Sequence, residues 1–208
     1  MNQKKLYIIR HGQTEYNRKG MVQGRGIDAD LNQVGERQAA LFYKKYSKHS
    51  FDKIYVSQLK RTKQSVQAFI NKGIPYEKLS GLDEISWGNQ EGQPFSDEAS
   101  RSYRETLDKW TSGKLDVSIS NGETPLEVME RQKIAINTIM SKNREREVLI
   151  CMHGRAMRIL LTWLVGRDLS QMEGIAHTNL GLYRVDAKDG NFEVKVENDT
   201  SHLVEFTV

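Results

Sequence analysis

The sequence contains little of several features that would place it in other classes of protein. Its 208 residues include one cysteine and three prolines. Cys151 has no partner for an internal disulfide, which is typical of a reducing compartment, and its apolar neighbours in 148–152 predict a buried, unreactive thiol. The longest apolar stretch, near 159–161, is too short to cross a bilayer, and no signal peptide precedes the first apolar run. We therefore expect a cytoplasmic protein with no membrane partner.

No charge of one sign dominates the chain. Thirty-one Lys and Arg stand against 27 Asp and Glu, and they are mixed along the sequence. A nucleic-acid binder more often carries a basic run or stripe, so we expect no nucleic-acid partner. No cluster of Cys, His or carboxylates has the spacing of metal ligands, and no Walker-type loop is present. We therefore predict neither a metal nor a cofactor, and a metal-independent activity.

Strand and helix patterns alternate along the sequence, and the length fits one domain over 1–208. Short apolar runs predict buried strands at 6–9, 52–57 and 148–152. Helical patterns cover 34–46, 59–70, 125–140 and the stretch after Gly154, and late strands at 180–185 and 192–196 flank a turn at 188–191. This alternation predicts a three-layer α/β fold with a mostly parallel central sheet flanked by helices.

Residues 93–121 do not fit that alternation. They are mostly polar, with an amphipathic stretch around Tyr103, Leu107 and Trp110. We interpret this segment as a small helical lid inserted into the domain.

Histidines and arginines follow the three buried strands. In open α/β sheets, ligands bind beyond the carboxyl ends of the strands. Arg10 and His11 follow the first strand, Arg61 lies about one helical turn beyond the second, and His153 with Gly154 follows the third. The planar fork of arginine matches the oxygens of a phosphoryl group. The sequence therefore predicts a phosphoryl-binding site at this edge of the sheet.

Longer motifs surround these residues and run nearly from one end of the chain to the other. They are Ile-Arg-His-Gly-Gln-Thr-Glu-Tyr-Asn at 9–17, Gln-Gly at 23–24, Leu-Asn-Gln-Val-Gly at 31–35, Ser-x-Leu-x-Arg-Thr at 57–62, Leu-x-Glu-x-x-Trp-Gly-x-x-Glu-Gly at 82–92, Gly-Glu-Thr at 122–124, His-Gly at 153–154 and Asn-Asp-Thr-x-His-Leu at 198–203. In this order the blocks resemble the histidine phosphatase superfamily, in its phosphoglycerate mutase-like branch.

The resemblance implies a role for each catalytic candidate. His11 would attack phosphorus and form a covalent phosphohistidine, while Arg10, Arg61 and His153 hold the phosphoryl oxygens. Glu84 would protonate the leaving group and then activate water.

Other residues of the motifs are assigned with less definition. Asp83 and Glu91 are alternative acids beside Glu84. Asn17, Gln23, Gly24 and Gly154 are expected substrate-binding residues, although Asn17 and Gln23 could instead brace a loop.

The motif after Glu84 favours a phosphatase acting on a small phosphate ester. Mutases of this branch carry an Arg-His pair there, whereas this chain has Ile85 and Ser86. The alternative is a cofactor-dependent phosphoglycerate mutase-type phosphotransferase, in which Arg101 and Arg104 could bind a carboxylate. A non-catalytic phosphate-binding protein is less favoured, because the histidines and arginines of the motifs are all present. The physiological substrate, the oligomeric state and the role of His177 stay open.

Overall fold

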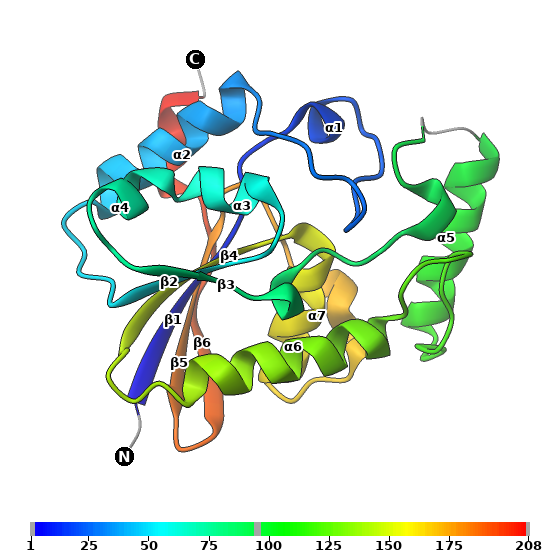
Figure 1. Cartoon of the computed structure of the whole chain (residues 1–208). Coiled ribbons are helices and arrows are strands. Elements are labelled where there is room, and N and C mark those ends of the chain that lie inside the picture. The colour runs from blue at the N-terminus through cyan, green and yellow to red at the C-terminus, as the bar shows by residue number, and fades with distance from the viewer. Residues whose placement is uncertain (1–2, 94–96, 207–208) are drawn as a thin grey trace.

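The computed structural model describes residues 3–93 and 97–206, so residues 94–96 of the expected lid lie outside the described residues. Six strands form one mixed sheet in the order β3-β2-β4-β1-β5-β6 (Figure 1). The strands are β1 (Gln3–Arg10), β2 (Lys53–Val56), β3 (Tyr76–Lys78), β4 (Glu147–Met152), β5 (Leu182–Lys188) and β6 (Asn191–Asp199). The neighbours from β3 to β1 pair in parallel, whereas β5 runs antiparallel to both β1 and β6.

Helices cover both faces of this sheet (Figure 1). The helices are α1 (Glu15–Arg18), α2 (Gln33–Tyr46), α3 (Lys60–Ser65), α4 (Gln67–Asn71), α5 (Asp97–Thr111), α6 (Pro125–Met140) and α7 (Gly154–Leu164). Short 3-10 helices are η1 (Ser80–Leu82), η2 (Gly88–Gln90), η3 (Leu169–Gly174) and η4 (Ser201–Phe206).

The alternating side chains of β1 explain the layers. Leu6 and Ile8 belong to the apolar cluster that includes α6 and α7. Tyr7 and Ile9 point to the opposite face and belong to the cluster that includes Phe42 of α2. Both clusters are fully or nearly fully buried. The expected three-layer α/β fold is therefore confirmed, with a mixed sheet at its centre.

The strand register brings three chain segments to one edge of the sheet. Arg10, at the end of β1, pairs with Met152 at the end of β4, and Val56 of β2 pairs with Cys151. The backbone N–H of His11 extends this pairing by donating to the Met152 carbonyl at 3.0 Å. The residues that follow β1, β2 and β4 consequently begin side by side.

Two details of the expected secondary structure were wrong. The helix expected over 59–70 is divided into α3 and α4 at Val66, whose φ of −119° and ψ of 11° are not helical. The edge strand β3 was not expected, because its three residues are polar and alternate exposed and half-buried positions. This strand exists because it pairs with β2, and such tertiary pairing cannot be predicted from a short polar sequence.

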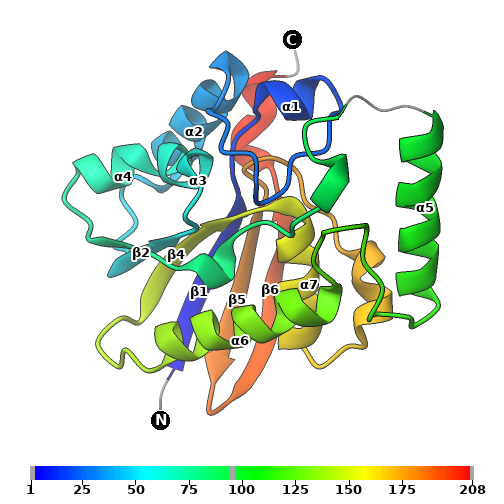
Figure 2. The ribbon, with the colours of Figure 1, turned by 45° about the vertical axis from the view of Figure 1, so that its right-hand side comes forward.

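Helix α5 stands outside the layers, beside η3 (Figure 2). Its inner stripe is the amphipathic stretch expected from the sequence, since Trp110 is buried and Tyr103 and Leu107 are half-buried in the same cluster. Trp87 stacks on Trp110 with ring centroids 5.7 Å apart. The segment after Glu84 is thus packed against the helix of the expected lid.

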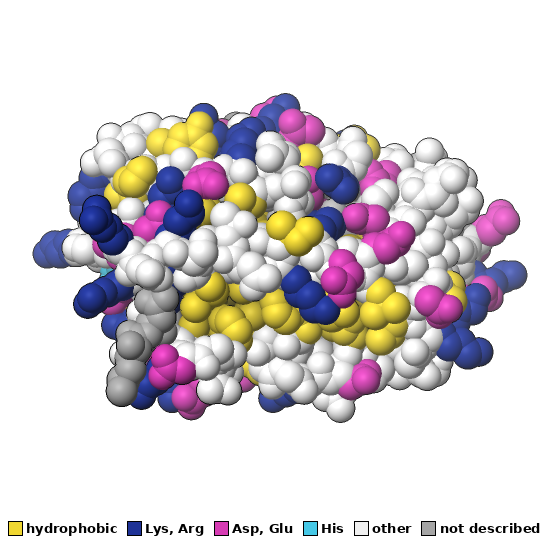
Figure 3. Space-filling model, turned by 60° about the horizontal axis from the view of Figure 1, so that its bottom comes forward, with side chains coloured by type: hydrophobic (Ala, Val, Ile, Leu, Met, Phe, Trp, Pro, Cys, Tyr) yellow, Lys and Arg dark blue, Asp and Glu magenta, His cyan; other side chains and the backbone are white. Residues whose placement is uncertain are grey.

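A band of apolar side chains crosses the face that Figure 3 turns forward. One hollow on the outer side of α6, α7 and the β5–β6 turn is lined by Ile136, Met140, Trp163 and Phe192. These residues lie away from the ends of β1, β2 and β4 that carry the candidate catalytic groups. None of the described helices has the length and hydropathy needed to cross a membrane.

Candidate active site

His11 is buried directly beyond β1, with 3% of its surface exposed. Its Nδ1 lies 2.7 Å from the carbonyl oxygen of Gly12. A carbonyl only accepts hydrogen bonds, so Nδ1 carries the proton and Nε2 has the free lone pair. Gly12 permits this close arrangement, since a Cβ there would come within 2.7 Å of the Gly35 carbonyl oxygen. The local backbone therefore fixes one tautomer of His11.

His153 lies beside His11, with ring centroids 5.1 Å apart. Arg61 donates from Nε to Nδ1 of His153 at 3.2 Å, so the proton of this imidazole is on Nε2, which is 2.8 Å from Oγ of Ser57. Both ring nitrogens of His153 thus have protein partners. In this geometry the imidazole orients Arg61, in addition to lying next to His11.

Arg61 and Arg10 place two guanidinium groups at the site. Arg61 is completely buried and also donates to the carbonyl oxygens of Ile27 and Gly24, at 2.6 and 3.3 Å. Arg10 donates from Nη1 to the carbonyl oxygen and to Nδ1 of His177, at 3.0 and 3.2 Å. Nε of Arg10 is buried without a hydrogen-bond partner among the described residues. That unsatisfied donor suits an anionic oxygen.

Burial and the arginines keep the imidazoles neutral. Burial, followed by the charges of Arg61 and Arg10, holds the pKa of His11 well below 6.5. Burial and then Arg61 lower the pKa of His153 in the same way. Burial also lowers the pKa of Arg61 to about 10, so this guanidinium still carries its charge at neutral pH. The site therefore combines neutral imidazoles with fixed positive charge.

His177, whose role was left open, belongs to this site. It lies in the loop before β5 and accepts the hydrogen bond of Arg10. Burial, with a further contribution from Arg10, lowers its pKa to about 4. Gly154, at the start of α7, faces this loop closely. A Cβ there would come 3.2 Å from Nδ1 of His177 and 3.4 Å from Nε of Arg10. Gly154 thus permits close packing of the two site elements.

The expected substrate-binding residues Asn17 and Gln23 are held by Thr14. Asn17 accepts from the Thr14 backbone N–H in the capping box of α1, and Oε1 of Gln23 accepts from the Thr14 hydroxyl at 2.8 Å. Nε2 of Gln23 is buried and, within the described chain, has no hydrogen-bond partner. A Cβ on Gly24 would collide with Oε1 of Glu91 at 2.1 Å. These residues brace the loop after α1, and Gln23 keeps one donor for a ligand.

The three acids near the Trp-Gly motif have different partners. Asp83 accepts from the backbone N–H of Gln58 at 2.8 Å and pairs with Arg25 at 3.2 Å. Burial raises the pKa of Asp83. Glu91 accepts from the backbone N–H groups of Gly26 and Trp87, both at or near 2.8 Å. Asp83 and Glu91 are thus both engaged in holding loops.

Glu84 is different, because its carboxylate lies at the start of α7. It accepts from the backbone N–H groups of Arg155 and Ala156, at 3.1 and 2.8 Å, and from that of Ile85 at 3.0 Å. The N-cap residue of α7 is His153, and its own side chain makes no capping bond. Glu84 therefore caps α7, whose first residue is Gly154. The charge of Glu84 also acts on both Arg10 and Arg61.

A buried histidine, the buried Arg61, the half-buried Arg10 and a carboxylate lie together beyond the strand ends of this α/β protein, a combination that suits a phosphoryl group. The family model of the histidine phosphatase superfamily (branch 1) matches residues 6–200. The chain belongs to this superfamily, as its motifs indicated, and it is an enzyme of the phosphatase kind.

Similar proteins cover nearly the whole chain. Phosphoserine phosphatase 1 of Hydrogenobacter thermophilus is 28% identical over 205 residues, which are 98% of this chain and 96% of that protein. Phosphoglycerate mutase-like protein 4 of Arabidopsis thaliana is also 28% identical, over 96% of this chain and 87% of that protein. The structure of Bacillus stearothermophilus YhfR has a TM-score of 0.83 at 26% identity and covers 96% of this chain and 99% of that one.

Proposed function

We propose that the chain hydrolyses small phosphomonoesters through a covalent phosphohistidine on His11, without a metal or another cofactor. The observation that carries this proposal is the buried, neutral imidazole of His11, whose Nδ1 is fixed on the Gly12 carbonyl and whose Nε2 is left nucleophilic. Two guanidinium groups adjoin it, and each can neutralise oxygens of a phosphoryl group.

The reaction then has two balanced steps. In the first, Nε2 of His11 attacks phosphorus, the ester P–O bond breaks, and Glu84 gives a proton to the leaving oxygen. In the second, water attacks the phosphohistidine, Glu84 takes a proton from it, and the P–N bond breaks to release phosphate. Arg10 and Arg61 would hold the phosphoryl oxygens in both steps, so positioning and charge supply most of the catalysis.

The surroundings of Glu84 support hydrolysis over a mutase reaction. Ile85 is completely buried and Ser86 uses its backbone N–H to bind Glu123, so neither supplies a cation for a second phosphate. Arg101 and Arg104 are exposed on α5, outside its buried stripe. We infer that residues 93–121 act as the lid of a single domain over 1–208, in a cytoplasmic enzyme. The lid would limit the substrate to a small ester, such as the phosphoserine named for one relative.

Phosphate release should be compared with mutase activity on the same preparation, with a chelator present. We expect release of inorganic phosphate from phosphoserine, 3-phosphoglycerate and an aryl phosphate to exceed interconversion of 2- and 3-phosphoglycerate. Efficient interconversion that depends on bisphosphoglycerate would refute hydrolysis as the main activity.

A further inference from the structure

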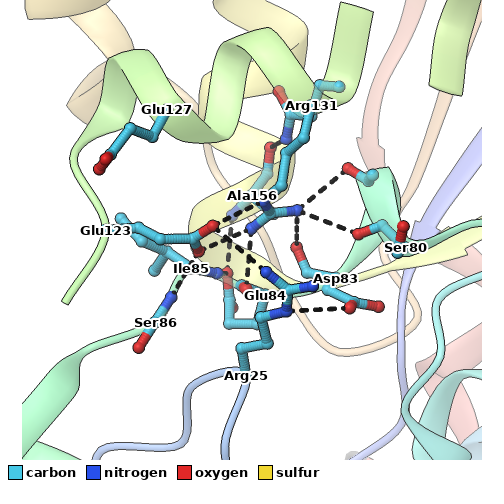
Figure 4. A network of polar contacts seen from close by, with 12 residues as sticks. Arg25, Ser80, Asp83, Glu84, Ile85, Ser86, Glu123, Glu127, Arg131 and Ala156 are labelled. Atoms are coloured by element: carbon cyan, nitrogen blue, oxygen red, sulfur yellow. Dashed lines mark hydrogen bonds and ion pairs between the residues drawn. The ribbon is translucent and has the colours of Figure 1, made fainter. Parts of the chain in front are cut away.

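The backbone that carries Glu84 has no regular secondary structure of its own. We call residues 83–86 the acid loop; they lie between η1 and η2. Figure 4 shows this loop beneath the side chain of Arg131, which comes down from α6. Arg131 belongs to none of the motifs that mark the phosphoryl site, and no part of the reaction proposed above uses it.

The guanidinium of Arg131 binds the carbonyl oxygens of the acid loop. Nη1 donates to Asp83 at 2.9 Å and to Gly81 at 3.1 Å, and Nη2 donates to the carbonyl of Glu84 at 2.9 Å. A carbonyl of a buried loop that lost its donor would be costly to leave unpaired. The planar fork of arginine reaches all these oxygens together, which a lysine ammonium cannot do.

Glu123 closes the arrangement from the other side. It receives Nε and Nη2 of Arg131 at 2.9 and 3.0 Å, and it accepts the backbone N–H of Ser86 at 2.8 Å. Arg25 lies between Glu123 and Asp83, at 3.5 and 3.2 Å (Figure 4). The acid loop is therefore gripped on both sides of Glu84.

The carboxylate of Glu84 is fixed separately, by the backbone N–H groups of Arg155 and Ala156 in α7. Arg131 holds the peptide of Glu84 against α6, while the first turn of α7, directly after His153, holds its side chain. The two attachments together set where a proton can be given relative to His11. A displacement of about 1 Å at such a position can cost about 10²-fold in rate.

We propose that Arg131 is a positioning residue for proton transfer by Glu84. This inference rests on the function proposed above. Among its hydrogen bonds in the described chain, Arg131 has none to His11, Arg10 or Arg61. Its charge is a lesser cause, after burial, Arg61 and His11, of the lowered pKa of His153, and Arg131→Lys keeps that charge. We therefore expect its main effect on the placement of Glu84 and not on phosphate binding. Loss of Arg131 should therefore slow the hydrolysis of esters whose leaving oxygen needs a proton. Hydrolysis of esters whose leaving group departs as a stable anion should change little.

The test compares an alkyl phosphate with p-nitrophenyl phosphate by kcat/KM in Arg131→Met and Arg131→Lys. We expect about a 10²-fold loss for the alkyl ester in Arg131→Met, with less than about fivefold for the aryl ester. Arg131→Lys should show the same selectivity to a smaller degree. Inhibition by inorganic phosphate should stay within about twofold of the wild type, because the phosphoryl site is intact.

The matched control is Lys133→Met on the same helix, where an exposed ion pair with Glu130 is removed. It should change neither ester. In the Glu84→Gln background, Arg131→Lys should add little further loss, because both residues serve one proton.

A uniform loss for both esters, or no loss, in folded Arg131→Lys would overturn the positioning role. If Arg131→Met does not fold, Arg131→Lys decides the question alone. Failure of the proposed function has a different signature, since His11→Ala would then retain activity or Glu84→Gln would show no selectivity between the two esters.

Discussion

The two halves of the candidate site are built in different ways. The phosphoryl half, with Arg10, His11 and His153, directly extends paired strands, and the backbone register of β1 and β4 sets its geometry. The acid half is a loop around Glu84 that depends on side chains from α6 and on the first turn of α7. Strand pairing thus positions the phosphoryl half, whereas side-chain and helix contacts position the acid half.

This difference suggests a division of labour. Phosphoryl binding and nucleophilic attack are common to phosphatase and mutase chemistry, and the proposed function places both on the phosphoryl half. The residues proposed to meet the leaving group or an incoming acceptor lie on the acid loop and on α5, which packs against Trp87 through Tyr103 and Trp110. Substitutions in the acid half can therefore change substrate specificity without disturbing the first chemical step.

The largest loss of activity should come from a substitution in the phosphoryl half. His11→Ala removes the nucleophile while leaving both arginines, so turnover of an aryl phosphate should fall by at least about 10⁴-fold. Alkaline quenching during turnover should trap a phosphohistidine in the wild type and none in the variant. His49→Gln is the control, because His49 pairs with Glu147 at the opposite end of β4. Wild-type turnover by His11→Ala would contradict the assignment of the nucleophile.

A smaller and more selective effect should come from the acid half. Glu84→Gln cannot deliver a proton, so we expect about a 10²- to 10³-fold loss of kcat/KM for an alkyl phosphate and a much smaller loss for p-nitrophenyl phosphate. With the aryl ester, the slowed attack of water should produce a burst of nitrophenol before the steady state. Equal losses for both esters, without a burst, would show that Glu84 is not the acid.

The same division explains what could be predicted from the sequence. The placement of His11, Arg61 and His153 in one site could be predicted from the sequence, because buried parallel strands bring the residues after them to one edge of the sheet. The choice among Asp83, Glu84 and Glu91 stayed open, because all three lie in one short segment. Their partners differ and favour Glu84, but several of those partners, at residues 25, 58, 155 and 156, are brought near only by the tertiary structure.

His177 was not assigned for a related reason. It precedes β5, and a loop before a strand meets the site only when that strand runs antiparallel to its neighbours. Leu182 at the start of β5 pairs with Ile9 near the end of β1, so the preceding loop reaches Arg10. Strand direction is set by tertiary pairing, and the apolar pattern of 180–185 does not contain it.

The smallest predicted effect concerns stability and pH in the phosphoryl half. His11 and His153 are held neutral in the folded chain, because burial and Arg61 lower the pKa of each well below 6.5. In the unfolded chain each regains its ordinary pKa and binds a proton as the pH falls. The unfolded state then binds more protons than the folded state, so the free energy of unfolding should fall with decreasing pH, by about 1.4 kcal/mol per histidine between roughly pH 7.5 and 5.5.

Urea unfolding at the two pH values measures this loss. His11→Ala removes one of the histidines whose pKa is lowered by folding, so its loss of stability over the same interval should be smaller than that of the wild type by about 1.4 kcal/mol. An unchanged pH dependence in His11→Ala would mean that folding does not lower the pKa of His11. That outcome would refute the statement that burial and the arginines keep His11 neutral, on which the proposed role of the phosphoryl half depends.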